Sequence, residues 1–476
     1  MSVVRRIAKN NSFLFVAETL TSISSLIILI IIGRVLGDVS LGRYTFACAF
    51  PQLLTVFIDL GYGTFLIKEI ARKKSKADYF LNNIIGIRLT LFILNTVTLI
   101  ILINLMGYPE ETKILVYLFG FFEFLKTFSN IFRLVFRAFE QMEYEAAVVF
   151  ISTILRTVIS IGLLLLGYSL IEIGIVFIFT GLLELCISLL LCRYKFVKPR
   201  LTISYSFFIK TIKTAFPLGL LTILGIIYIR IDTVFLSILK GDAVVGWYNA
   251  AYNIVLGFHP IPHLFMHSLL PIMSYLHLKS SSKLQKGYEK SFKYLLFLGL
   301  PISTGAYILA DEFILLFYGS EFLNSITALQ ILAWDVIIKF LYICSSFVLI
   351  STDKQNKMVL IVGVSALINI ILNLILIPEY SFMGAGIATL ITECFILICY
   401  MFLNWKHGIK LNLIKFVIQP IIGCVVMVLV LFQIENFSLF IKIFIGMIVY
   451  FIMIVLTRGF EKDDYLMIKG LLKISK

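Results

Sequence analysis

The amino-acid sequence predicts an all-α polytopic membrane protein with about fourteen transmembrane helices. Of its 476 residues, 60% are hydrophobic and only 14% are charged, and the mean hydropathy is +1.01. A soluble domain cannot bury so much apolar surface, and uncharged apolar stretches long enough to span a bilayer recur along the chain. Because the alternating pattern of transmembrane β-strands is not seen, we expect the spans to be helices.

The predicted spans follow one another with short connections. The first span has a basic lead and no small-residue cleavage site, so we expect a retained helix rather than a signal peptide. The longest connection, 193–213, has 21 residues and leaves no room for a soluble domain. The fourteen spans are 11–33, 44–67, 81–105, 113–136, 145–167, 169–192, 214–237, 244–275, 292–310, 325–350, 357–377, 382–403, 412–432 and 437–457.

A short polar motif occurs twice and indicates an internal duplication. Gly37-Asp38-x-x-x-Gly42-x-Tyr44-x-x-Ala47 recurs 204 residues later as Gly241-Asp242-x-x-x-Gly246-x-Tyr248-x-x-Ala251. The hydrophobic spans around the motif repeat as well, as in membrane proteins built from two structural repeats. We therefore predict an N-terminal six-helix lobe over 1–192, a cytoplasmic linker over 193–213, a C-terminal six-helix lobe over 214–403, and two appended helices with a basic cytoplasmic tail over 404–476.

Lysine and arginine alternate sharply between the two sides of the predicted protein. Of the 41 basic residues, 30 lie before the first span, after an even-numbered span or within the first four residues of the span that follows, whereas the opposite loops and the first six residues of the spans after them hold 5. Basic residues accumulate in cytoplasmic loops, so we expect a multi-pass plasma-membrane protein with both termini in the cytoplasm. The same rule accounts for the net charge of +14 without a nucleic-acid partner. The tail from Phe460 to Lys476 is expected to lie on the inner membrane surface.

Thirteen charged side chains remain within the predicted spans beyond these first residues. Each costs about 2.5–3.5 kcal/mol at a helix centre, so these side chains are expected to face one another or a hydrated cavity between two bundles. Glu123, Lys126 and Arg133, for example, share one helical stripe. The basic residues are Arg88, Lys126, Arg133, Arg156, Arg230 and Lys339, and the acidic ones are Glu18, Asp59, Glu123, Glu184, Asp232, Asp335 and Glu393.

Structural roles are an alternative for several of these charges. Glu123 with Lys126, and Asp335 with Lys339, have the spacing of pairs that neutralise each other and join helices. Arg133 and Arg230 lie close enough to a membrane edge to extend their charges into water. Arg156 lies in the middle of its span and has no acid three or four residues away, which favours a role in binding.

Three histidines in the eighth span have a spacing that can bind a metal ion or relay protons. His259, His263 and His267 recur every fourth residue, but Pro260 and Pro262 are expected to disturb their shared face. No cysteine or close acid completes a set of metal ligands, so cavity lining or packing is the alternative, and we predict no metal site. The seven cysteines show no CxxC spacing and indicate neither a disulfide framework nor a zinc site.

Two motifs suggest a known family. One is Asp232…Gly241-Asp242-x-x-x-Gly246-x-Tyr248, and the other is Asn369-x-x-x-Asn373-x-x-x-Ile377-Pro378 followed by Gly384-Ala385-Gly386-x-Ala388-Thr389. They resemble motifs of polysaccharide-unit flippases, the Wzx-type branch of the multidrug/oligosaccharidyl-lipid/polysaccharide (MOP) exporter superfamily. Six plus six helices with two appended also fit this family, and the resemblance covers nearly the whole chain.

The resemblance implies two lobes in alternating access that move a polyprenyl-diphosphate-linked oligosaccharide from the cytoplasmic to the outer leaflet. The cationic lumen of such flippases is matched in kind by Arg88, Lys126, Arg156 and Lys339, and we add Arg133 and Arg230 as candidate substrate-binding residues. Glu18, Asp59 and Asp232 are candidates for binding a coupling sodium ion or proton. Partners would be the lipid-linked oligosaccharide, membrane lipids, and a polysaccharide polymerase or glycosyltransferases of the same pathway.

Two other functions are compatible with parts of the sequence. A multidrug antiporter of the same fold would need unpaired acids such as Glu18, Asp59 or Asp232, and an unpaired Arg156 argues against it. A membrane glycosyltransferase would need an acidic metal-binding cluster in a large outer loop, whereas the outer acidic pairs stand alone in short loops. The sequence has no Walker motif, so we expect neither direct ATP use nor enzymatic activity.

Overall fold

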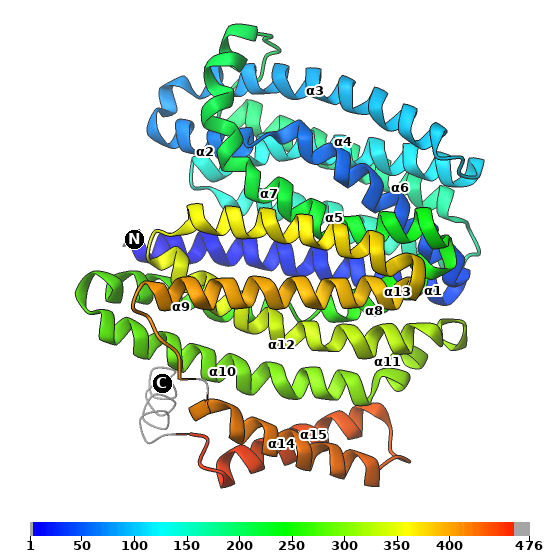
Figure 1. The fold of residues 1–476 in the computed structure, drawn as a ribbon. Coiled ribbons are helices and arrows are strands. Elements are labelled where there is room, and N and C mark those ends of the chain that lie inside the picture. The colour runs from blue at the N-terminus through cyan, green and yellow to red at the C-terminus, as the bar shows by residue number, and fades with distance from the viewer. Residues whose placement is uncertain (1–2, 413, 461–476) are drawn as a thin grey trace. The chain divides into compact units, whose positions relative to one another are not determined.

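The structure is a computed structural model that describes residues 3–412 and 414–460, and every regular element in these ranges is helical (Figure 1). The α-helices are α1 Val3–Asp59, α2 Tyr62–Arg72, α3 Ala77–Leu105, α4 Glu110–Ala138, α5 Met142–Leu165, α6 Leu170–Lys195, α7 Tyr205–Lys240, α8 Asp242–Leu256, α9 Pro260–Lys279, α10 Ser281–Ile308, α11 Ala310–Phe317, α12 Asn324–Ser351, α13 Gln355–Lys406, α14 Ile414–Gln433 and α15 Leu439–Leu456. Two 3₁₀ turns, Lys74–Lys76 and Ser320–Phe322, lie between them. Most of the predicted basic tail lies outside the described residues.

The all-helical membrane fold is confirmed. Among the described residues, 10 helices are long and apolar enough to cross a membrane, or 11 if α10 and α11, which meet at a 72° bend, form one span. This number is lower than fourteen because α1 and α13 each contain two predicted spans, which meet at non-helical residues Gly37 and Ser381. The predicted span 244–275 is divided between α8 and α9.

The repeated motif has the same backbone geometry in both copies. Gly37 has φ 81° and ψ −179°, and Gly241 has φ 87° and ψ 179°. This region of conformational space is essentially restricted to glycine, because a Cβ atom would clash with the neighbouring backbone. The chain therefore changes direction in the same way inside α1 and between α7 and α8.

The two copies also contact each other through their glycines. A Cβ atom built on Gly42 would lie 1.8 Å from the carbonyl oxygen of Asp242, and one on Gly246 would lie 2.1 Å from the carbonyl oxygen of Asp38. Both distances are too short for any side chain. Each copy of the motif thus presents its glycine to the aspartate backbone of the other copy.

Polar side chains reinforce this reciprocal contact. Arg43 Nε lies 3.1 Å from Asp242 Oδ2, and Arg43 Nη1 lies 2.5 Å from Glu111 Oε2 at the start of α4. Trp247 Nε1 donates a hydrogen bond of 2.7 Å to Asp38 Oδ2. Each aspartate of the repeated motif therefore accepts from the residue that follows the glycine in the other copy.

The chain forms two compact units. Unit 1 contains the residues up to Asn253 together with Val362–Ala385, and unit 2 contains Ile254–Ile361 and the residues from Gly386 onward. In unit 1, α4 packs against α6, and α1 packs against α5, α4 and α7. In unit 2, α10 packs against α12 and α14, and α14 pairs with α15. These units follow packing rather than the repeat, so the two six-helix lobes remain a proposal that rests on the repeated motif.

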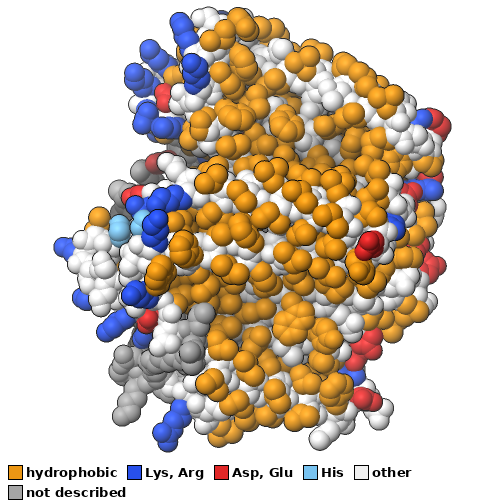
Figure 2. Space-filling model, in the orientation of Figure 1, with side chains coloured by type: hydrophobic (Ala, Val, Ile, Leu, Met, Phe, Trp, Pro, Cys, Tyr) orange, Lys and Arg blue, Asp and Glu red, His pale blue; other side chains and the backbone are white. Residues whose placement is uncertain are grey.

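The outer surface has the composition expected of a membrane protein. Figure 2 shows hydrophobic side chains over most of the visible face, with charged side chains gathered near its edges. Large apolar side chains such as Leu105, Leu165 and Phe440 are more than 70% exposed. Exposed apolar surface on this scale is stable only against lipid.

Candidate functional site

A chain of charged and amide side chains links three helices of unit 1. Gln52 of α1 lies at its centre. Its Oε1 atom accepts a 2.8 Å hydrogen bond from Arg230 Nε of α7, and its Nε2 atom donates one of 2.9 Å to Glu123 Oε1 of α4. Lys126 Nζ lies 3.2 Å from the same glutamate oxygen, and the lysine side chain is 47% exposed. The cluster therefore holds two cations and one carboxylate, with Lys126 in contact with the carboxylate and Arg230 linked to it through Gln52, which leaves a net positive charge.

A second cluster in unit 1 has the same charge balance. Glu184 of α6 lies between two arginines, with Oε1 3.4 Å from Arg133 Nη2 of α4 and Oε2 3.5 Å from Arg156 Nη2 of α5. The glutamate also accepts hydrogen bonds from Ser129 Oγ at 3.2 Å and from Ser152 Oγ at 3.1 Å. All three charged side chains are largely buried. Here one carboxylate faces two cations.

The setting of Arg156 corrects part of the sequence interpretation. It was expected to have no acid within reach, but its partner Glu184 lies on the neighbouring helix α6. The guanidinium also lies over the rings of Phe122 and Phe177, at 4.6 and 5.2 Å from their centroids, and its Nε lies 3.3 Å from Thr180 Oγ1. Arg156 is thus held in place on several sides, while the cluster keeps its excess positive charge.

Arg88 and Asp59 form a neutral pair. The Arg88 side chain is buried, forms an ion pair with the Asp59 carboxylate, and donates a 3.0 Å hydrogen bond to the carbonyl oxygen of Thr127. Asp59 Oδ1 also accepts a 3.0 Å hydrogen bond from the backbone amide of Gly63, in the first turn of α2. Both residues were candidates for binding, and their contacts also give them a structural role at the junction of α1 and α2.

Glu18 and Asp232, the other two coupling candidates, have different surroundings. Glu18 is exposed and lines a polar cavity of about 390 Å³ together with Arg133 and Arg137. Asp232 is buried and accepts a 3.0 Å hydrogen bond from the hydroxyl of Tyr248 and one of 2.7 Å from the amide of Asn373. The amide oxygen of Asn369, 3.0 Å from Asn373 Nδ2, adds an oxygen ligand near this carboxylate.

Unit 2 contains the remaining charges of the predicted spans. Lys339 of α12 forms an ion pair with Glu393 of α13, and its ammonium lies 5.3 Å from the centroid of the Tyr342 ring. Asp335, one turn away on α12, lies 3.3 Å from the Nε2 atom of His259. Spacing along the sequence paired Asp335 with Lys339, whereas the structure adds partners from α13 and from the start of α9.

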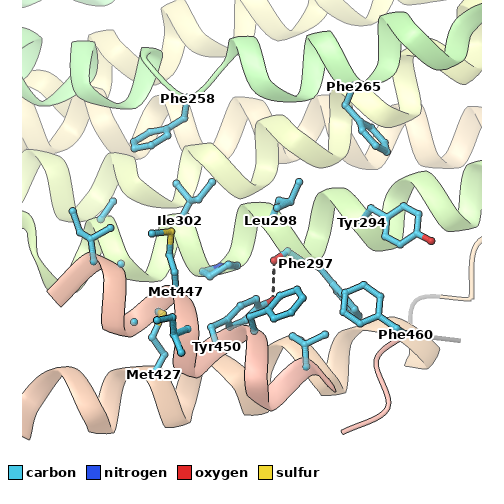
Figure 3. Close-up of a pocket in the computed structure, with 18 of the residues that line it drawn as sticks. Phe258, Phe265, Tyr294, Phe297, Leu298, Ile302, Met427, Met447, Tyr450 and Phe460 are labelled. Carbon is cyan, nitrogen blue, oxygen red and sulfur yellow. Dashed lines mark hydrogen bonds between the residues drawn. The ribbon is translucent and has the colours of Figure 1, made fainter. Parts of the chain in front are cut away.

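Unit 2 also contains a large apolar chamber that sequence reasoning missed. Its volume is about 1570 Å³, and its walls are α9, α10, α14 and α15. Figure 3 shows aromatic and aliphatic side chains directed into it, and one wall is held by a 2.9 Å hydrogen bond from the hydroxyl of Tyr450 to the carbonyl oxygen of Phe297. Side chains that line it include Phe258, Phe265, Leu298, Ile302, Met427 and Met447. Because hydropathy does not distinguish a chamber wall from a lipid-facing surface, the sequence carried no signal for it.

Two solved structures with a similar fold are titled as a flippase and as a multidrug transporter. "Lipid II flippase MurJ, inward closed conformation" matches with a TM-score of 0.78 and 20% identity, and the match covers 94% of this chain and 98% of that chain. An inward-facing multidrug resistance MATE family transporter matches with a TM-score of 0.64 and 15% identity, over 80% of this chain and 93% of that chain. The fold is therefore that of the MOP superfamily of multi-pass membrane transporters.

The family described as "Polysaccharide biosynthesis protein" matches residues 7–277, which is more than half of the chain. The chain belongs to this family, as the sequence motifs predicted, and a second family, "MatE", matches residues 217–375. This membership places the chain among transporters rather than enzymes.

Two relatives support the same assignment. "Capsular polysaccharide biosynthesis protein CapF" of Staphylococcus aureus is 24% identical over 409 residues, which are 83% of this chain and 98% of the relative. "Probable low-salt glycan biosynthesis flippase Agl15" of Haloferax volcanii is 25% identical over 238 residues, which are 48% of this chain and 50% of the relative. Both names concern the biosynthesis of a polysaccharide or glycan.

Proposed function

We propose that the protein is a flippase that carries a polyprenyl-diphosphate-linked oligosaccharide from the cytoplasmic to the outer leaflet by alternating access. The observation that carries this proposal is the cluster of unit 1 in which two largely buried arginines, Arg133 and Arg156, share the carboxylate of Glu184. The second cluster, in which Lys126 contacts Glu123 and Arg230 is linked to it through Gln52, has the same excess of one positive charge. A buried excess of positive charge is costly without an anion, so such clusters favour an anionic substrate. The names of the relatives CapF and Agl15 point to the same substrate class.

The chemistry of the substrate explains why both clusters would be needed. A diphosphate cannot enter hydrocarbon without its water shell unless fixed cations and hydrogen-bond donors replace that shell. Arg156, Arg133, Arg230 and Lys126 supply guanidinium and ammonium groups for this purpose, and guanidinium can hold two phosphate oxygens at once. Arg88 and Lys339 are each paired with one acid, and we propose that they contribute to the field around the substrate rather than bind it directly.

The apolar chamber of unit 2 supports a lipid carrier. Its walls expose almost only carbon, and its volume of about 1570 Å³ is large enough for a substantial length of hydrocarbon chain. Each CH₂ group transferred from water to such a surface contributes about 0.8 kcal/mol. We propose that this chamber accommodates the polyprenyl tail of the substrate.

Transport in one direction requires an energy source, and we propose a sodium ion or proton bound by Glu18, Asp59 or Asp232. Asp232 accepts hydrogen bonds from Tyr248 and Asn373, and Asp59 pairs with a buried arginine. Carboxylate oxygens are the ligands that small hard cations prefer in proteins. On the proposed topology both termini lie in the cytoplasm, and a polysaccharide polymerase or glycosyltransferases of the same pathway are proposed as partners.

The runner-up function is an antiporter of organic cations, which the "MatE" match over residues 217–375 favours. Such a carrier would need acids in its binding site without cationic partners. Glu123, Glu184, Asp59 and Glu393 instead form ion pairs with lysine or arginine, so Glu18 and Asp232 are the acids that such a carrier would have to use. The charge balance therefore favours the anionic substrate.

Translocation in proteoliposomes tests the proposal. The substrate is a fluorescent oligosaccharide on a polyprenyl diphosphate, and its movement is followed by loss of accessibility to a quencher that does not cross the membrane. We expect translocation of the diphosphate, and much slower translocation of the uncharged polyprenyl glycoside as control. Uptake of an organic cation, without movement of the diphosphate, would instead establish the antiporter.

A further inference from the structure

The three histidines of the predicted eighth span lie on one face of α9. The helix begins at Pro260, and His259 precedes it in a helical conformation. Proline is tolerated in the first turn of a helix because the amides there have no helical partner. The expectation that Pro260 and Pro262 disturb the shared face is therefore wrong, and His259, His263 and His267 follow one another on successive turns.

All three histidines face α12. The ring centroid of Phe347 lies 6.3 Å from that of His263 and 4.8 Å from that of His267. The two histidine rings are 6.4 Å apart. His263 and His267 are exposed, whereas His259 is largely buried against α12. Along this face of α9, the exposed imidazoles of His267 and His263 are therefore followed by the largely buried imidazole of His259.

The buried end of this face meets a carboxylate with unusual surroundings. Asp335 is 0% exposed, and its Oδ2 atom lies 3.3 Å from His259 Nε2. Within the described residues, neither carboxylate oxygen has a hydrogen bond of good geometry. A buried carboxylate without such bonds carries a large desolvation cost in its charged form. The site therefore needs either a proton or a nearby positive charge.

Asp335 and the charged side chains around it have a net charge of one negative unit, which a single proton would neutralise. Asp335 and Glu393 are acidic and Lys339 is basic, so the group carries one negative charge while His259 is neutral. Other titratable side chains that face it are Tyr342 on α12, Tyr400 on α13 and His263 on α9. Tyrosine and an exposed histidine supply no fixed positive charge near neutral pH. One added proton makes the buried group neutral.

We propose that His259 and Asp335 together bind one proton, and that His267 and His263 conduct it to them from the exposed face of α9. Because the carboxylate requires a donor, Nε2 of His259 carries its hydrogen toward Asp335, and the incoming proton is taken by Nδ1. The product is an imidazolium that pairs with the carboxylate. As a coupling site this rests on the proposed flippase function, whereas proton binding itself does not.

The position of His259 gives the proton a mechanical effect. The helical span is interrupted at 257–259 between α8 and α9, and the two compact units divide just before this break, after Asn253. Protonation changes the attraction between His259, at the start of α9, and Asp335 of α12. The bound proton therefore acts close to one of the three places where the chain passes from one unit to the other, and a coupling ion in alternating access must bias such a segment.

Histidine titration tests the site directly. The chain has 5 histidines, so the protein labelled with ¹⁵N-histidine in nanodiscs gives few signals, which single His→Gln substitutions assign. We expect the His259 signal to titrate between about pH 5 and 8 in the wild type and to lose this titration in Asp335→Asn. His277, exposed in the last turn of α9, is the control, and its signal should be the same in both proteins at every pH. A His259 signal that stays neutral throughout in the wild type, or that ignores Asp335→Asn, would overturn the proposal.

Transport under a pH gradient tests the coupling. In proteoliposomes with the membrane potential clamped, a gradient of one pH unit should change the wild-type rate by up to about tenfold for a one-proton step. His259→Gln, Asp335→Asn and His267→Gln should lose this response, and His277→Gln should keep it. If the wild type moves no lipid-linked diphosphate, the flippase function fails while the histidine titration still decides the proton site. If the wild type transports and His259→Gln keeps the full response, the proton site fails and the flippase function stands.

Discussion

Glu184 can neutralise only one of the two arginines that it contacts. It lies 3.4 Å from Arg133 and 3.5 Å from Arg156, and two serine hydroxyls also donate to it. In a buried setting the second positive charge attracts any anion that reaches the cluster. Arg156 also rests on two phenyl rings, which leaves its guanidinium ordered before a substrate arrives.

Substitution of Arg156 should therefore reduce transport in graded steps. Arg156→Lys keeps the charge but loses the two-point contact, so partial activity is expected, whereas Arg156→Gln should be at least about tenfold slower, since a hydrogen bond to a charged group contributes about 1.5–3 kcal/mol. The measurement is the rate of translocation and the affinity for the lipid diphosphate, at matched expression.

A double substitution separates binding from charge balance at the same site. If Arg156 serves only to neutralise Glu184, then adding Glu184→Gln to Arg156→Gln should restore transport. If Arg156 binds phosphate, the double variant should stay slow, while Glu184→Gln alone stays active because both arginines remain. Recovery in the double variant would contradict the binding role.

Glu18 and Asp59 should respond differently to loss of charge. Both Glu18→Gln and Asp59→Asn are expected to slow gradient-driven transport, as proposed coupling residues. Asp59→Asn should in addition lower stability by about 3–5 kcal/mol, because it leaves Arg88 buried without its acid. Glu18 is exposed, so its variant should unfold like the wild type. Thermal unfolding of both variants checks this, and equal melting temperatures would refute the structural role of the Arg88–Asp59 pair.

At the scale of helices, the contact between the two copies of the repeated motif has no room for a side chain. Gly42→Ala and Gly246→Ala would place a methyl group within about 2 Å of a backbone oxygen on the opposite copy. The helices must then separate, so we expect loss of stability or a shift toward conformations in which α1 and α8 are apart. Gly225→Ala in α7, where nothing lies within 4 Å, is the control.

Disulfide trapping measures this separation. Cysteines at Asp38 and Trp247, whose side chains are hydrogen-bonded, should cross-link in an otherwise cysteine-free protein and less efficiently after Gly42→Ala. Unchanged cross-linking, together with unchanged melting, would show that the close approach of the glycines is not needed.

Interactions within a helix could be predicted from the sequence, and those between helices could not. The spacing of Glu123 and Lys126 identified an ion pair that the structure confirms at 3.2 Å. Glu184 and Arg156 are 28 positions apart, and only the packing of α5 against α6 brings them together. The same limit explains His259 and Asp335, which meet because α9 packs against α12.

At the scale of the whole molecule, the distribution of basic residues predicts the orientation in the membrane. We expect Lys74→Cys and Lys283→Cys to react with a membrane-impermeant thiol reagent only from the cytoplasm, and Glu110→Cys only from outside. All three side chains are exposed, and Glu110 is preferable to Glu111, which pairs with Arg43. The measurement requires replacement of the 7 native cysteines. Reaction of Lys74→Cys from outside would invert the topology.

The fold class, the family and the repeated motif were all accessible from the sequence because each depends on local composition or on exact residue identity. The apolar chamber was not, since Phe297, Met447 and Tyr450 lie far apart along the chain and read as ordinary hydrophobic residues of a span. The two C-terminal helices, α14 and α15, form part of the chamber wall, and this contribution is apparent only from their packing against α10.

That chamber has a practical consequence for work with the purified protein. A space of about 1570 Å³ lined by carbon will not stay filled with water when the protein is extracted from the membrane. Detergent tails or co-purified lipids of suitable length will enter it and compete with whatever the cell supplies. The detergent used for solubilisation is therefore itself a ligand of the chamber. Affinities for polyprenyl compounds that are measured in long-chain detergents should be weaker than those measured in short-chain detergents.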